Sequence, residues 1–200
     1  MSDFQLHVLS TGGQPPDQWI EIAGYVHNAM DYFHIREKRA TASQLLEWVD
    51  LLLKQGVPAD KIVINDRVDV ALARSLSVQL AYHSLPVNEV KKLNSGIRSG
   101  VSIHSQKEAM QAAALGADLV FFGHIYETDS KPGLPPKGTE ALLPTVKACS
   151  VPVIAIGGIK PHHVPLIKKT GAAGIAVQSG IMNAKDPLEA ITAYRKGGFS

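Results

Sequence analysis

The stretch Val153-Ile154-Ala155-Ile156-Gly157-Gly158 decides the fold that we expect for this chain. Its first four residues are apolar at consecutive positions, which is typical of parallel strands whose two faces are both covered. Two glycines follow at once, where the chain would leave the strand. The stretch therefore predicts a buried strand that ends in a tight loop, as in an α/β protein.

Short apolar runs of this kind recur along the whole chain. The candidate strands are Phe4–Leu9, Tyr32–Arg36, Ile62–Asn65, Val78–Leu80, Val101–His104, Leu119–Gly123, Val153–Gly157 and Gly174–Val177. Eight strands in 200 residues leave about 25 residues for each strand and its helix, which is close to the lower limit for a (β/α)₈ TIM barrel. A doubly wound open sheet is the alternative, but the sequence STGGQPP after Leu9 does not match its G-x-G-x-x-G loop. We predict one near-minimal TIM barrel domain over residues 1–200.

The segments between these runs carry helix-end signals. Thr41 and Ser105 stand three residues before Gln44 and Glu108, which is capping-box spacing. Asp186 is an expected N-cap, with Pro187 at the first helical position. Left-handed C-cap glycines are expected at Gly56, Gly116 and Gly171. These signals support alternating strands and helices.

Composition excludes several classes of protein. The chain is 45% hydrophobic, carries a formal net charge of +2 and has one cysteine, so intrinsic disorder and a disulfide framework are excluded. The absence of a long basic run argues against a nucleic-acid partner, and the strand-sized apolar runs argue against a membrane span. The N-terminus lacks signal-peptide character. We predict a cytoplasmic protein, and the sequence leaves open whether it forms a homo-oligomer.

The strongest local signal for a ligand lies after the last two strands. Gly157-Gly158 and Ser179-Gly180 stand there, and these two loops are the recurrent phosphate site of the barrel fold. Backbone N–H groups can approach an anion closely at glycine. The alternative is that the glycines only turn the chain. We predict a phosphate-bearing ligand.

His124 follows the sixth strand and begins the longest connection, Tyr126–Gly138. A loop of this length in a compact chain is a candidate lid, and an imidazole can take and return a proton near neutral pH. A structural histidine bonded to a carbonyl is the alternative. We predict that His124 is a general acid/base.

Other polar residues end the remaining strands. Arg36 and Lys38 flank Glu37, and they form either an anion clamp or a salt-bridged rim. Asn65, Ser102 and His104 complete a candidate substrate-binding rim with them. Asp66 has no second carboxylate at the neighbouring strand end, and the histidines on separate strands lack acidic partners for zinc. We predict no metal and no cofactor.

The sequence resembles the thiamine phosphate synthase superfamily over essentially its whole length. The motifs HIREK, NDRVDVALA, GVSIHS, GHIYETDSKPG, VIAIGGI and AVQSGI occur in order. The resemblance implies a thiazole phosphate bound by the loops of Gly158 and of Gln178 and Ser179. It also implies substrate contacts from Thr128, Ser130 and Lys131. A synthase of this family joins a pyrimidine pyrophosphate to the thiazole phosphate and needs magnesium.

Three positions depart from the synthase pattern. His34 stands where the Q-x-R-x-K motif has Gln, Ser84 stands where the second magnesium carboxylate falls, and His124 stands where Pro is usual. These substitutions resemble the thiazole tautomerase branch, TenI, whose histidine matching His124 is the acid/base.

The resemblance to that branch predicts an isomerase of thiamine biosynthesis. His124 would abstract the C2 proton of a thiazole carboxylate phosphate and return a proton to the exocyclic carbon, which aromatises the ring. A small-molecule thiazole phosphate would then be the partner. Two alternatives stay open: a thiamine phosphate synthase, and a non-catalytic regulator that binds thiazole phosphates.

Overall fold

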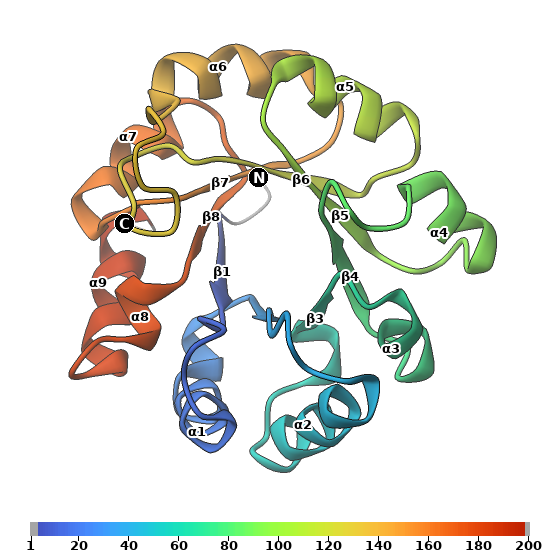
Figure 1. The fold of residues 1–200 in the computed structure, drawn as a ribbon. Coiled ribbons are helices and arrows are strands. Elements are labelled where there is room, and N and C mark those ends of the chain that lie inside the picture. The colour runs from blue at the N-terminus through green and yellow to red at the C-terminus, as the bar shows by residue number, and fades with distance from the viewer. Residues whose placement is uncertain (1–3, 199–200) are drawn as a thin grey trace.

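The computed structural model describes residues 4–198 as a closed barrel of eight parallel strands in sequence order, with the helices outside the ring (Figure 1). The strands are β1 (Gln5–Leu9), β2 (Tyr32–Ile35), β3 (Ile62–Asn65), β4 (Ser77–Leu80), β5 (Ser99–Ile103), β6 (Leu119–Gly123), β7 (Val153–Ile156) and β8 (Gly174–Val177). The predicted (β/α)₈ TIM barrel is therefore confirmed, and each strand begins and ends within two residues of its expected bounds.

Helices cover the outer face of the barrel. They are α1 (Pro16–Val26), α2 (Ala42–Lys54), α3 (Val68–Ala73), α4 (Val87–Leu93), α5 (Gln106–Ala114), α6 (Gly138–Ala148), α7 (Val164–Lys169), α8 (Ser179–Met182) and α9 (Pro187–Gly198). Short 3₁₀ turns are η1 (His27–Ala29), η2 (Ala59–Lys61) and η3 (Pro161–His163). No helix within residues 4–198 is both long enough and apolar enough to cross a membrane.

The predicted helix ends are confirmed. Thr41 and Gln44 form a capping box at α2, and the Ser105 side chain accepts from the Glu108 N–H at α5. Asp186 Oδ1 accepts from the Glu189 N–H at 2.9 Å, where α9 begins. The three C-cap glycines have positive φ angles: Gly56, Gly116 and Gly171. Side-chain hydrogen bonds thus fix where these helices start.

Two separate apolar clusters pack on the two sides of the strand ring. The larger lies between strands and helices and includes Trp19, Phe33 and Tyr194. The smaller fills part of the barrel lumen and consists of Leu9, Leu119, Phe121, Ile154 and Ala176. The rest of the lumen carries polar side chains, so its packing depends on hydrogen bonds as well as apolar contact.

The ring closes between the first and last strands. Gln5 pairs with Gly174 and Val8 pairs with Val177. Above this seam, Gln178 Nε2 donates to the Ser10 carbonyl oxygen at 2.8 Å. All strand C-termini therefore end at one mouth of the barrel, where active sites of this fold lie.

Candidate active site

Arg36 is the first residue after β2, and its guanidinium has no carboxylate partner among residues 4–198. Its backbone N–H donates to Ser10 Oγ at 2.8 Å, which fixes the start of its loop. Glu37 does not pair with it, because Glu37 Oε1 accepts from the Gly12 N–H at 3.2 Å. Lys38 follows in an exposed turn. The structure thus disfavours a rim closed by an Arg36–Glu37 ion pair and leaves the Arg36 guanidinium for an external anion.

Asp66, at the mouth after β3, is already held by protein groups. Ser84 Oγ donates to Asp66 Oδ1 at 2.6 Å and accepts from the Ala81 N–H at 2.8 Å. His83 Nε2 lies 3.4 Å from Asp66 Oδ2. Within residues 4–198 no three His, Cys, Asp or Glu side chains gather as a metal site. A single engaged carboxylate does not fit the several-oxygen coordination of Mg²⁺, so we assign no step to that ion.

Ser102 and His104 lie on β5 and just beyond it. Ser102 Oγ accepts from Gln79 Nε2 at 3.1 Å. The His104 ring is exposed, with Nδ1 3.1 Å from the Gly123 carbonyl oxygen, and its backbone N–H donates to Glu108 at 2.7 Å. His104 therefore joins β5 to the end of β6, and both residues remain near the predicted rim.

His124 is buried, with 6% of its surface exposed. Its Nε2 lies 3.2 Å from the Leu134 carbonyl oxygen, within the long loop after β6. The Lys137 N–H donates to the His124 carbonyl oxygen, so the end of this loop folds back on its start. His124 is thus engaged in the carbonyl contact that the sequence left open as the alternative to acid/base chemistry.

Thr128, Ser130 and Lys131 form one turn of that loop. The Ser130 N–H donates to Thr128 Oγ1 at 3.3 Å, and the Lys131 N–H donates to the Thr128 carbonyl oxygen at 3.0 Å. Ser130 is exposed and Lys131 is half-buried. The structure brings these three residues together, and their contact with a substrate stays a prediction.

The glycines after β7 have a packing role that the sequence did not indicate. Gly157 and Gly158 have φ angles of +98° and +66°. A Cβ on Gly158 would collide with the carbonyl oxygens of Tyr126 and Glu127, and one on Gly157 would collide with His124. Both positions thus need glycine because the loops after β6 and β7 pack backbone to backbone.

The predicted phosphate-binding residues after β8 are also in use by the fold. A Cβ on Gly180 would collide with the Tyr194 hydroxyl, and the Gln178 amide is bonded to Ser10. Ser179 is exposed at the first position of α8. The backbone N–H groups of these loops and the Ser179 hydroxyl remain the candidate phosphate donors, and this site stays a prediction.

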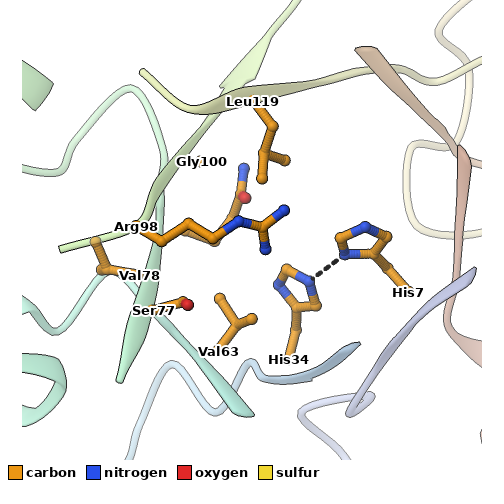
Figure 2. A pocket seen from close by; sticks show the side chains of 9 residues that line it. His7, His34, Val63, Ser77, Val78, Arg98, Gly100 and Leu119 are labelled. Carbon is orange, nitrogen blue, oxygen red and sulfur yellow. Dashed lines mark hydrogen bonds between the residues drawn. The ribbon is translucent and has the colours of Figure 1, made fainter. Parts of the chain in front are cut away.

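Sequence reasoning missed a polar cluster inside the barrel. His7 and His34 are fully buried, and Figure 2 shows their rings in one small cavity with Arg98. Burial lowers the pKa of His34 to about 3 and lowers that of His7 well below its usual value, and the Arg98 charge adds to both shifts. The His34 ring lies inside the barrel, in a cavity also lined by Ser77 and Leu119 from the first residues of β4 and β6. Its alternation with apolar neighbours in β2 was the available signal.

A family model described as thiamine monophosphate synthase matches residues 16–181. The chain belongs to the thiamine monophosphate synthase family. Thiamine-phosphate synthase from Chlorobium phaeovibrioides is 40% identical over 80% of this chain and 78% of its own. The Chloroflexus aurantiacus enzyme of that name is 37% identical over 96% of this chain and 92% of its own. The predicted resemblance to the superfamily is confirmed.

Solved structures agree with this family assignment. Thiamine phosphate pyrophosphorylase from Pyrococcus furiosus superposes with a TM-score of 0.82 at 28% identity, and the match covers 98% of this chain and 96% of that one. A 3-hexulose-6-phosphate synthase, with a TM-score of 0.75 at 19% identity, shares the fold. The barrel is thus common to several chemistries, and the family rests on sequence.

The comparisons contradict the predicted thiazole tautomerase. The Chlorobium and Chloroflexus relatives carry the name of a synthase, which is a transferase, and neither carries that of an isomerase. The prediction rested on three departures from the synthase pattern, and the structure gives each of them a local contact. His34 bonds His7, Ser84 bonds Asp66, and His124 contacts the Leu134 carbonyl. The isomerase class is therefore wrong.

Proposed function

We propose that this chain is a thiamine-phosphate synthase, a transferase that joins a pyrimidine pyrophosphate to a thiazole phosphate with release of pyrophosphate. The observation that carries the proposal is the 37% identity to the Chloroflexus synthase over 96% of this chain. The barrel mouth is the reaction site because all strand C-termini meet there.

Both substrates are anionic, and cationic side chains stand at the barrel mouth in two loops, one after β2 and one after β6. The Arg36 guanidinium, without a carboxylate partner in the described residues, stands after β2, with Lys38 in the exposed turn that follows. Lys131 stands in the loop after β6, across the mouth. Negative charge gathers on the departing pyrophosphate, and fixed cations aimed at it would lower the barrier. We assign this role to Arg36 first, with Lys38 and Lys131 supporting.

The thiazole phosphate would bind on the β7 and β8 side of the mouth, to backbone N–H groups of Gly157, Gly158 and Gly180 and to the Ser179 hydroxyl. In that placement Arg36 and the phosphate loops hold the two substrates from different sides. Holding two reactants in line is the larger part of catalysis when little proton transfer is required. His124 then positions the loop after β6, and we assign no proton-transfer step to it.

The test is a coupling assay with both substrates, in the presence and absence of Mg²⁺, followed by detection of thiamine phosphate. We expect multiple turnovers. Arg36→Gln should lower kcat/KM by about 10²-fold, which is typical for loss of one charge-stabilising group. Lys54→Gln is the matched control, since it removes a cation from the exposed end of α2. Folded protein that binds thiazole phosphate but forms no product would overturn the proposal and favour a non-catalytic binding protein.

A further inference from the structure

Ser10 is the first residue after β1, and it stands between the two anion sites that the proposed function places at the mouth. It is fully buried although it is polar. Its backbone N–H donates to the His34 carbonyl oxygen at 3.0 Å, so it extends the pairing of β1 with β2 by one residue. Its hydroxyl and its carbonyl then bond different neighbours, one on the β2 side and one on the β8 side.

The Ser10 hydroxyl takes the place of a backbone carbonyl in the pairing of β1 with β2. In a regular parallel ladder, a residue that donates to one residue of its partner strand accepts, through its own carbonyl, from the residue two positions further on. For Ser10 that residue is Arg36. The Arg36 N–H instead donates to Ser10 Oγ at 2.8 Å. A serine is needed here because an alanine would remove this acceptor.

The Ser10 carbonyl bonds the β8 side of the mouth. Its oxygen accepts from Gln178 Nε2 at 2.8 Å. Gln178 directly precedes α8, and its own carbonyl accepts from the N–H groups of Ile181 and Met182. Ser179, a candidate donor to the thiazole phosphate, is the next residue of the chain. One buried residue thus bonds both the loop of Arg36 and the start of α8.

The rest of the loop after β1, residues 10–14, makes the same two connections, and we call it the β1 loop. The Gly12 N–H donates to Glu37 Oε1 at 3.2 Å, and Gln14 Nε2 donates to the Met182 carbonyl oxygen at 2.7 Å. A Cβ on Gly12 would lie 3.3 Å from the Arg36 carbonyl oxygen and 3.9 Å from its Nη1. The Arg36 guanidinium therefore lies beside the β1 loop.

We propose that Ser10 is a positioning residue, which fixes the Arg36 guanidinium relative to the loops predicted to bind the thiazole phosphate. Because it is fully buried, it acts through Arg36 on one side and through Gln178 on the other. The proposal rests on the proposed function, in which Arg36 faces the departing pyrophosphate. Charge-stabilising groups are effective when the surrounding structure holds them in place before the reaction.

Binding of inorganic pyrophosphate, without added Mg²⁺, tests this role and needs no activity. Ser10→Ala removes the acceptor of the Arg36 N–H, so we expect pyrophosphate to bind about tenfold more weakly. Ser99→Ala is the matched control. Ser99 is also fully buried, but it begins β5 at the other end of the barrel, where its hydroxyl donates to the Ile97 carbonyl oxygen. Its affinity for pyrophosphate should stay within about twofold of the wild type, because Arg36 keeps its position.

A double-mutant cycle shows whether Ser10 acts through Arg36. Arg36→Gln should weaken pyrophosphate binding more than Ser10→Ala does, because it removes the cation itself. In the Arg36→Gln background, Ser10→Ala should have little further effect, since the group that it positions is gone. Equal weakening by Ser10→Ala in both backgrounds would overturn the proposal and leave Ser10 a general packing role. An unchanged affinity of Ser10→Ala would overturn it as well.

Gly12→Ala tests the same role from the surface, and it stays informative if Ser10→Ala does not fold. Gly12 is exposed and has a φ of +76°, so a side chain there is strained and lies against the Arg36 carbonyl oxygen. We expect weaker pyrophosphate binding by a folded protein. Gly13→Ala is the matched control, because a Cβ on Gly13 would meet no atom within 4 Å. If Ser10→Ala does not fold, equal affinities of these two glycine variants would overturn the proposal.

The coupling assay separates positioning from packing. Ser10→Ala should lower kcat about tenfold, because Arg36 stabilises charge that develops only as pyrophosphate leaves. The KM for the thiazole phosphate should stay within about twofold, because the Ser10 carbonyl keeps its bond to Gln178. A fall in kcat matched by an equal rise in this KM would overturn the proposal. If the wild type forms no product, the proposed function fails, and the pyrophosphate titration still decides the role of Ser10.

Discussion

The lumen of this barrel has two halves that are stabilised in different ways. Under β6, β7 and β8, and at the Leu9 end of β1, it is filled by apolar side chains such as Leu119, Phe121 and Ile154. Under β1 to β5 it holds His7, His34 and other polar groups that depend on one another for hydrogen bonds. The apolar half is stable as long as its side chains fill the lumen. The polar half is stable only while its histidines keep the protonation state that their hydrogen bonds need.

Lowering the pH should destabilise the polar half of the lumen before the apolar half. The resulting loss of unfolding free energy is the largest effect that we expect. Unfolded histidines titrate near pH 6.5, whereas His34 in the folded protein titrates at about 3 and His7 also well below its usual value. Between these values the unfolded chain binds more protons, so stability falls as the pH drops below 6.5. From pH 7 to pH 5 the two rings together should cost about 4 kcal/mol of unfolding free energy.

Urea unfolding at the two pH values measures this loss. The carboxyl groups whose pKa is lowered by arginine partners, Asp50 beside Arg74 and Asp69 beside Arg67, contribute mainly below this window, so it isolates histidines. Burial and the neighbouring His162 and Lys160 also lower the pKa of His163, which adds to the loss. Equal stability at pH 7 and pH 5 would show that the polar half tolerates charge.

A cavity in the apolar half should be costly but independent of pH. Ile154 is fully buried on β7, and Ile154→Ala should lower the unfolding free energy by about 3 kcal/mol through lost contact and a residual void. The loss should be the same at pH 7 and pH 5, because the variant leaves both histidines in place. The milder Ile154→Val should cost about 1 kcal/mol. A strongly pH-dependent loss would mean that the two halves are coupled.

An effect smaller than that of Ile154→Ala is expected at a glycine that makes room for a polar group. A Cβ on Gly100 would collide with Gln79 Oε1, and Gln79 is buried and bonded to Ser102. Gly100→Ala should therefore cost about 2 kcal/mol by displacing that side chain. In a Gln79→Ala background the same change should cost much less. An equal cost in both backgrounds would place the strain in the backbone.

Sequence reasoning succeeded where structure depends on local pattern. Leu119–Gly123 and Gly174–Val177 were predicted with their observed bounds because strands buried on both faces are apolar at consecutive positions. Thr41 marked the start of α2 because its side chain bonds a backbone group three residues away. Local contacts of this kind are visible in a single sequence.

The rest depends on contacts between distant residues. His7 and His34 are 27 residues apart, and only the register of β1 with β2 reveals that they meet. The packing of Gly158 against Tyr126 and Glu127 likewise requires two loops from different strands. At the candidate site, glycine and histidine each suit both a functional and a structural role. The residue type alone could not decide between them.

The seam between β1 and β8 determines when this protein can finish folding during synthesis. Gln5 is synthesised well before its partner Gly174, which emerges from the ribosome only after the seven strands that precede β8. Until then β1 presents an unpaired parallel edge, which is a template for wrong pairing with other chains. Seven strands can assemble in sequence order as they emerge, yet none of the intermediates is a closed ring. The nascent protein should therefore depend on chaperones until β8 is released.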